Sequence, residues 1–433
     1  MVARRMAAVM LAASAALAAQ SQAYMAKHPA IRSVITRIEG HDNAPAVIIP
    51  RAGDRLTVSF DEESLESRQL RYRLIHCDPH WHPSQLIESE YIDGFNEAPL
   101  DDGTYSRATL THYVHYRLTV PTDIIPTISG NYLIEIFDDY DTARPTLISI
   151  PFGVSEQSVD IAATVSPRTD TDYLGAHQQL SIDLDLDRIW NEITSPYTDI
   201  IVTVEQDSRP ETRVELTSPT AVTGRRARYD HLPQLIFKAG NEYRRMETVD
   251  TRRPGMGIAS VGQNAGRFTA ETEPATARAG SPYAYDRTQH GRMLVRTVDS
   301  DRPDTEADYV DTGFTLVSEP IEGCDVYVEG ELTGRRLDKT SRMDYDPTAG
   351  AYRSAQAGSL QLPLSGRRPP HRTADRGTDR GKLPPDRQRI HHQSLLPATH
   401  CPGLPSGRSD RHYKRPMTNE DKNEEIMIEI GNT

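Results

Sequence analysis

Hydrophobic and polar residues alternate along much of this chain. The segments 55–61 (RLTVSFD) and 70–77 (LRYRLIHC) place every second residue on one face, so that Leu70, Tyr72 and Leu74 share a side of the second segment. An alternation of period two, rich in β-branched and aromatic residues, is typical of half-buried strands. Gly, Pro and Asp stand in the breaks and favour turns. Short strands at this spacing predict a β-sandwich.

The same rhythm continues along the chain, with segment 181–187 (SIDLDLD) as a clear example, and 433 residues are too many for one core. We therefore expect an all-β protein of tandem immunoglobulin-like sandwich domains. We place the first domain at residues 24–155, the second at 156–270 and an incomplete third at 271–357. After this point the strand pattern stops, so residues 358–433 are expected to be a non-native or disordered tail.

Residues 1–23 have the plan of a secretory signal peptide. Two arginines precede an Ala-rich apolar run from Met6 to Ala19, and small residues follow it. The run is too short to span a bilayer comfortably. We expect an exported protein that is cleaved between Ala18 and Ala23.

The formal net charge of −13 argues against a nucleic-acid-binding or anionic-membrane-binding surface, since either requires a basic stripe. The three cysteines, Cys77, Cys324 and Cys401, are odd in number and widely spaced, which is not the pattern of a disulfide scaffold. The domains must therefore be held by ordinary hydrophobic cores.

The segment HCDPHWH brings His76, Cys77, His80 and His82 within seven residues, a ligand set that zinc prefers. On a strand, however, His76 and Cys77 point to opposite faces, and no further ligand has a recognisable spacing. We interpret the segment as a structural loop anchored by Trp81, whose ring packs while its N–H finds an acceptor. We expect no bound metal.

No sequence motif indicates catalysis. The chain has no G-x-S-x-G, no P-loop and no G-x-G-x-x-G, and its many carboxylates form no convincing catalytic pair. We therefore expect a protein that is not an enzyme and needs no cofactor.

Seven segments together resemble the plug-protein family of the type IX secretion system of Bacteroidota. Four of them are 72–97 (YRLIHCDPHWHPSQLIESEYIDGFNE), 105–121 (YSRATLTHYVHYRLTVP), 129–139 (SGNYLIEIFDD) and 237–247 (FKAGNEYRRME). The other three are 307–316 (ADYVDTGFTL), 325–334 (DVYVEGELTG) and 343–352 (MDYDPTAGAY). The family does not require histidine at the positions of His80 and His82. The similarity runs from about Ala44 to Ala357. The positions that match the family pattern are His76, Cys77, Asp78, Trp81, Ser84, Glu90, Tyr91, Gly94, Phe95, Tyr113, Tyr116, Gly130, Asn131 and Tyr132, and farther on Gly240, Asn241, Glu242 and Arg244.

The resemblance implies a periplasmic protein at the inner face of the outer membrane. Its partner would be a very large outer-membrane β-barrel translocon, which the protein binds and closes when no substrate is in transit. Neither nucleic acid nor direct lipid insertion is implied.

Two other functions stay open at this point. One is a carbohydrate-binding accessory β-sandwich, which exposed aromatic residues aligned in a groove would favour. The other is a metal-dependent hydrolase, which clustered histidines around an open coordination position would favour.

The family match ends at Ala357, and the genetic code offers a reason. With free codon choice, residues 380–397 can be encoded so that reading one nucleotide later gives EGNYHQTGNEYTIKVYY, which alternates like a strand. Residues 358–366 yield GAYNYRYLV in the same frame. We infer that residues 358–416 are a frame-shifted reading of a genuine β-segment and that 417–433 lie beyond the native end. A clean resequencing of the locus, without a single-nucleotide slip near the Ala357 codon, would contradict this inference.

Overall fold

The computed structural model describes most of the chain from residue 24 to residue 354 and three strands after it. The described residues are 24–42, 44–172, 177–207, 209, 212–239, 242–278, 290–296, 300–321, 324–354, 359–363, 393–400 and 426–432. The predicted signal peptide lies outside them.

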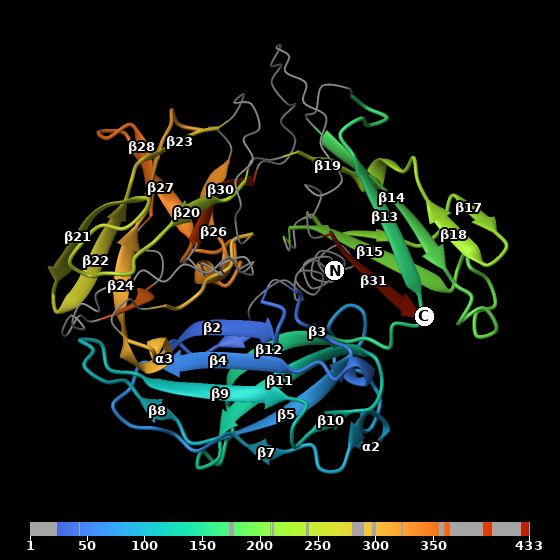
Figure 1. The fold of residues 1–433 in the computed structure, drawn as a ribbon, viewed down its shortest axis with the longest axis horizontal. Coiled ribbons are helices and arrows are strands. Elements are labelled where there is room, and N and C mark those ends of the chain that lie inside the picture. The colour runs from blue at the N-terminus through green and yellow to red at the C-terminus, as the bar shows by residue number, and fades with distance from the viewer. Residues whose placement is uncertain are drawn as a thin grey trace, which may run out of the picture.

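The first module is a sandwich of two main sheets (Figure 1). One sheet runs β1-β12-β11-β5-β7, with β3 beside β12, and the other runs β2-β4-β9-β8. A small third sheet joins β10 to β6. Their bounds are β1 Ala26–Lys27, β2 Ile31–Ile38, β3 Val47–Ile48, β4 Leu56–Glu62, β5 Leu70–Cys77, β6 Ile92–Asp93, β7 Ala98–Pro99, β8 Thr104–Tyr105, β9 Val114–Val120, β10 Ile125–Pro126, β11 Gly130–Asp138 and β12 Thr146–Val154, with helices η1 Pro50–Ala52 and α2 Glu88–Tyr91.

The predicted alternation fills the core of this module. Leu70, Tyr72 and Leu74 of β5 are all buried, and β5 pairs antiparallel with β11 so that Ile134 stands opposite Leu74 and is itself buried. Alternate side chains of a strand point to opposite faces, so one face of each sheet can close the core. The predicted all-β sandwich architecture is confirmed.

The second module packs two sheets, β13-β14-β18-β17 with β19 beside β14, and β16-β15-β31. Its core includes Ile182 and Leu184, two apolar positions of the segment 181–187. The bounds are β13 Asp160–Ser166, β14 His177–Asp185, β15 Ile200–Gln206, β16 Val214–Leu216, β17 Ala221–Thr223, β18 Arg226–Tyr229, β19 Ile236–Lys238 and β31 Ile426–Asn432, with η3 Pro233–Leu235.

The third module contains the sheets β20-β30-β26-β27-β28-β25-β23 and β21-β22-β24-β29. The bounds are β20 Arg244–Met246, β21 Ile258–Asn264, β22 Arg267–Thr272, β23 Ala275–Thr276, β24 Ala307–Gly313, β25 Thr315–Val317, β26 Asp325–Glu329, β27 Arg342–Asp346, β28 Ala351–Ser354, β29 Ser359–Pro363 and β30 Gln393–His400, with helices α3 Pro303–Glu306 and η4 Glu331–Thr333.

Strand pairing corrects the predicted division between the second and third modules. β22 pairs in parallel with β24, and Met246, Ile258 and Ala270 share a core with Val310. The strands from β20 onward therefore belong to the third module, which begins near residue 242 and not at 271. The sequence could not place this boundary, because the strand pattern runs through it without a break and only the partner strand decides.

Three segments of the predicted patternless tail form strands. β29 pairs with β24, β30 pairs with β20 and β26, and β31 pairs with β15. Strand pairing uses backbone N–H and C=O groups, which every residue but proline supplies in full, so these three segments can pair without an alternating side-chain pattern. β29 and β30 overlap the two segments in which the shifted reading frame gives a strand pattern.

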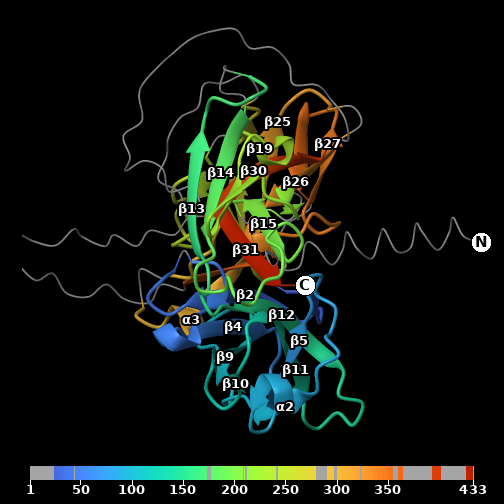
Figure 2. The same cartoon turned by 90° about the vertical axis from the view of Figure 1, so that its right-hand side faces the viewer.

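The three modules form a triangle in Figure 1, with the second and third side by side above the first. Helix α3 of the third module lies next to β2 and β4 of the first in both ribbon views (Figures 1 and 2), and Tyr309 of β24 contacts Asp61 of β4 and Ser33 of β2. Within the described part of the chain, the helices are too short or too polar to cross a membrane.

Candidate functional site

The loop that follows β5 carries the first block of family-like residues. The Asp78 carboxylate accepts hydrogen bonds from the backbone N–H groups of His80 (2.8 Å) and His82 (2.9 Å). Partial burial favours a higher pKa for Asp78, but these backbone hydrogen bonds hold that pKa below its ordinary value. From the neighbouring strand β11, Asn131 Nδ2 donates to the Asp78 carbonyl at 3.1 Å. Asp78 therefore closes the loop and remains a charged carboxylate.

Trp81 anchors this loop, as predicted. Its side chain is buried and packs on Cys77 beside Met25, Ile75 and Leu133. Its backbone has the left-handed φ of 64°, which is uncommon for a residue other than glycine. The prediction that the indole N–H finds an acceptor is wrong among the described residues, because the ring lies between apolar side chains.

His76 belongs to an aromatic cluster. Its ring lies 5.1 Å from the Tyr132 ring and 5.7 Å from the Tyr91 ring, measured between centroids, and burial lowers the pKa of the imidazole. Gly130 has a φ of 144°, and a Cβ there would lie 2.4 Å from His76 Nε2. The His76 ring thus fills the space that a side chain at position 130 would need, so this packing requires glycine there.

Other motif residues also build the fold. Ser84 N donates to His76 O at 2.8 Å, Glu90 Oε2 accepts the N–H of Ile87 at 2.9 Å at the start of α2, and Tyr116 accepts the N–H of Arg68 at 2.7 Å. Among the described residues, no three His, Cys, Asp or Glu side chains come together as metal ligands. The motif is therefore a structural frame in the part of the chain that the structure describes.

Phe95 is the exception, because its side chain is 91% exposed. It follows β6, which pairs with β10, and three more exposed apolar residues lie nearby in the chain or in this pair: one in β10 and two just before helix α2. We call these four residues the tip surface: Leu86, Ile87, Phe95 and Ile125. α2 and β10 lie at the end of the first module that points away from the other two modules (Figures 1 and 2).

A buried polar cluster joins the first module to the third. Asp61 of β4 accepts a hydrogen bond from Tyr309 of β24 at 2.6 Å and contacts His115 Nδ1 at 2.7 Å. Ser33 Oγ lies 3.0 Å from the Tyr309 hydroxyl. Burial raises the pKa of Asp61. Burial opposes protonation of His115, but the hydrogen bond to Asp61 raises the pKa of that imidazole. Each of the two groups therefore holds a proton more strongly than it would in water.

An ion pair reinforces this junction. Both terminal nitrogens of Arg37 in β2 lie 2.5 Å from the two carboxylate oxygens of Glu331 in η4. Glu331 also accepts the N–H of Met293 at 2.6 Å. Such a bidentate pair fixes orientation as well as distance, so it holds the first and third modules as one body.

Known proteins share parts of this sequence and fold. The family model described as the type 9 secretion system plug protein 1st domain matches residues 31–156. The chain belongs to the type IX secretion system plug family. A crystal structure of a hypothetical protein from Parabacteroides merdae is similar, with 32% sequence identity and a TM-score of 0.72, over 77% of this chain and 85% of that one. Comparison with curated proteins gave no match.

The second group of plug-family motif residues also has a structural role where the structure describes it. The carbonyl of Glu242 accepts a hydrogen bond from Arg278 at 2.8 Å, and Arg244 donates to the carbonyl of Thr276. Gly240 and Asn241 lie outside the described residues. This group ties the start of the third module to the segment around β23.

The sequence missed the junction residues of this plug-family protein. Tyr309 and Asp61 are 248 positions apart, and Arg37 and Glu331 are 294 apart. Neither pair has a local signature, because an acidic residue on a strand is normally a solvated one. The burial of three consecutive residues, Phe60, Asp61 and Glu62, breaks the period of two, but only the structure shows it.

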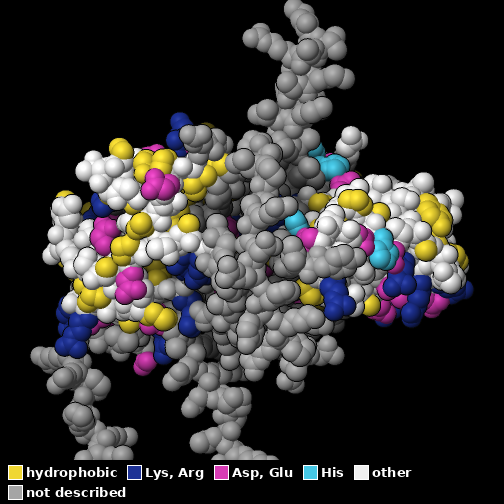
Figure 3. Space-filling model, turned by 90° about the horizontal axis from the view of Figure 1, so that it is seen from above, with side chains coloured by type: hydrophobic (Ala, Val, Ile, Leu, Met, Phe, Trp, Pro, Cys, Tyr) yellow, Lys and Arg dark blue, Asp and Glu magenta, His cyan; other side chains and the backbone are white. Residues whose placement is uncertain are grey.

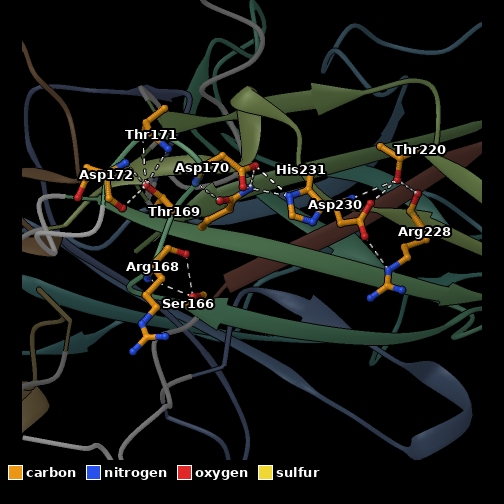
Figure 4. A network of polar contacts seen from close by, with 11 residues as sticks. Ser166, Arg168, Thr169, Asp170, Thr171, Asp172, Thr220, Arg228, Asp230 and His231 are labelled. Carbon is orange, nitrogen blue, oxygen red and sulfur yellow. Dashed lines mark hydrogen bonds and ion pairs between the residues drawn. The ribbon is translucent and has the colours of Figure 1, made fainter.

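A second polar network closes one end of the second module (Figure 4). The Asp170 carboxylate accepts a hydrogen bond from Gln179 Nε2 at 2.7 Å and contacts His231 Nδ1 at 3.0 Å, while Thr169 Oγ accepts the N–H of Asp172 at 2.9 Å. These contacts tie the turn after β13 to Gln179 in β14 and to His231 after β18. We assign them a role in shaping this turn.

Charges of both signs are mixed on the described face in Figure 3. On the second module they form pairs such as Arg188 with Asp160 at 3.0 Å and Arg226 with Asp185 at 3.2 Å. A surface of this kind is not the basic stripe that nucleic acid requires.

Proposed function

We propose that this protein is a periplasmic plug that binds and closes the outer-membrane translocon barrel of the type IX secretion system. Its membership of the plug family gives it a role in type IX secretion. The observation that carries the finer proposal is the tip surface, four exposed apolar residues at one end of the module that the family model matches.

The surroundings of the tip surface fit a protein partner. Exposed apolar side chains stand among the exposed carboxylates of Glu88, Glu90 and Asp93. An apolar centre with a polar rim is typical of protein interfaces, whereas carboxylates oppose docking on anionic lipid. A barrel wall at the periplasmic mouth is the partner that this proposal names.

The junction between the modules supports the same function physically. A plug must remain a folded body larger than the opening that it blocks. The buried contacts of Asp61 with Tyr309 and of Arg37 with Glu331 keep the first and third modules from moving independently. The tip surface is thus presented on a rigid support.

The double variant Ile87→Ser, Phe95→Ser tests the proposal. We expect co-purification of the barrel from outer membranes to fall at least about tenfold, since exposed apolar anchors dominate interface energies. Permeability to bulky antibiotics should rise as it does when the gene is deleted.

The matched control is Tyr197→Ser, which removes a half-exposed aromatic residue from the second module. It should retain both the barrel and the permeability barrier. Unchanged permeability on gene deletion, with no barrel in the pull-down of the unaltered protein, would contradict the plug function itself.

A carbohydrate-binding function finds less support. Within the described residues, the exposed aromatic side chains Phe95, Tyr105, Tyr140 and Tyr197 belong to four separate segments. A sugar-binding groove requires such rings in a row.

A further inference from the structure

Strand β13 forms one border of the second module, and its outer edge has no partner among the described residues. It pairs only with β14, in an uninterrupted antiparallel register from Asp160 to Ser166. Figure 2 shows β13 at the margin of the module. An edge strand of this kind presents a row of backbone N–H and C=O groups that another strand can pair with.

The inward face of β13 is also incompletely covered. Ile161, Ala163 and Val165 stand opposite Leu184, Ile182 and Leu180 of β14 and therefore point to the same side. The three β14 residues are buried, whereas Ile161 on the same face of the sheet is 41% exposed. Ala163 is exposed and Val165 is half-buried. The core of the sandwich thus continues onto β13 as an apolar row that the opposite sheet leaves open.

Apart from Asp160 at its start, the strand lacks the features that normally protect an edge. Natural edges carry a charged residue, a proline or a bulge against pairing. From Ile161 to Ser166 the sequence is IAATVS, with no charge, no proline and no glycine, and the register has no shift. A continuous backbone edge beside an apolar row has the two elements that bind an added strand.

We propose that β13 is a docking site for an extended segment of a partner protein, which adds to the sheet as a further strand. The segment has apolar residues at alternate positions, where they extend the row of Ile161, Ala163 and Val165, and it carries no net negative charge. This site is separate from the tip surface and does not depend on the plug function.

A second copy of the chain fits the edge less well. One pair of seven-residue strands buries less than the roughly 1,200 Å² typical of stable protein complexes. The formal net charge of −13 also makes two copies repel each other. An extended segment without net negative charge avoids this repulsion, and main-chain hydrogen bonds supply most of its affinity.

The chain offers a matched pair of variants. Ala162 and Ala163 are adjacent and exposed, and they point to opposite faces of β13. Ala163→Lys places a charge on the apolar row, whereas Ala162→Lys places the same charge on the outward face. Both variants should fold, because neither position is buried.

The probe is a synthetic peptide of alternating valine and threonine with a lysine at each end, and its control has proline at the centre. Hydrogen–deuterium exchange of the full chain should show slower exchange in residues 160–166 with the first peptide only. Binding should weaken at least about tenfold in Ala163→Lys and less than about twofold in Ala162→Lys. Absence of protection, equal loss in both variants, or a concentration-dependent dimer that Ala163→Lys abolishes would overturn the proposal.

Discussion

Replacing Arg37 by Ala is expected to lower the free energy of unfolding by about 3–5 kcal/mol, because it leaves the Glu331 carboxylate buried without its partner. Both carboxylate oxygens of Glu331 lie 2.5 Å from Arg37 nitrogens, and only about a tenth of the Glu331 side chain is exposed (10%). The N–H of Met293 and the more distant charge of Arg292 do not replace this bidentate contact. The first and third modules should separate more easily as a result.

Denaturant unfolding measures this effect, with Arg55→Ala as the matched control. Arg55 pairs with Glu39 at 3.8 Å, and both side chains are about half exposed, so its loss should cost at most about 1 kcal/mol. The double variant Arg37→Met, Glu331→Leu should recover much of the stability, since an apolar pair of similar volume often replaces a buried ion pair. Equal effects of Arg37→Ala and Arg55→Ala would contradict the assigned role of the pair.

The pH dependence of this contribution has a defined sign. Burial on its own would raise the pKa of Glu331, but Arg37 holds that pKa below its ordinary value of 4.5. A carboxylate with a lowered pKa in the folded state stabilises the fold fully above its unfolded-state pKa. The contribution is therefore complete at neutral pH and declines as the pH falls from about 4.5 through the folded-state value.

Trp81→Ala is expected to cost about 3–5 kcal/mol, because it empties the space that the ring fills beside Cys77. The Trp81 side chain is only 4% exposed, and the loop that carries it closes on Asp78. Differential scanning calorimetry should show a lower unfolding temperature for the variant.

The neighbouring histidines are the controls. His80 and His82 are exposed, so His80→Ala and His82→Ala should change stability by no more than about 0.5 kcal/mol. A comparable loss in either histidine variant, together with one tightly held zinc per chain in elemental analysis, would overturn the structural interpretation of this loop.

The local alternation of apolar and polar residues was sufficient to predict an all-β fold. Leu70, Tyr72 and Leu74 alternate with polar residues, and a period of two has one physical solution, a strand with one buried face. Trp81 was identifiable for a similar reason, since a large ring in a short loop is stable only when it packs. The family motif was also recognisable, because its residues lie close together in the chain.

The tertiary structure alone decided which strands share a sheet and which faces stay open. The pattern predicts a strand at β13, but the uncovered row of Ile161 and Ala163 depends on how far the opposite sheet extends. In the sequence, Asp61 and Glu331 resemble ordinary surface carboxylates. Their partners, Tyr309 and Arg37, come from distant parts of the chain and are known only from the structure. The period of a strand is a local property of the backbone, whereas burial, charge pairing and the exposure of Phe95 depend on neighbours that only the folded chain provides.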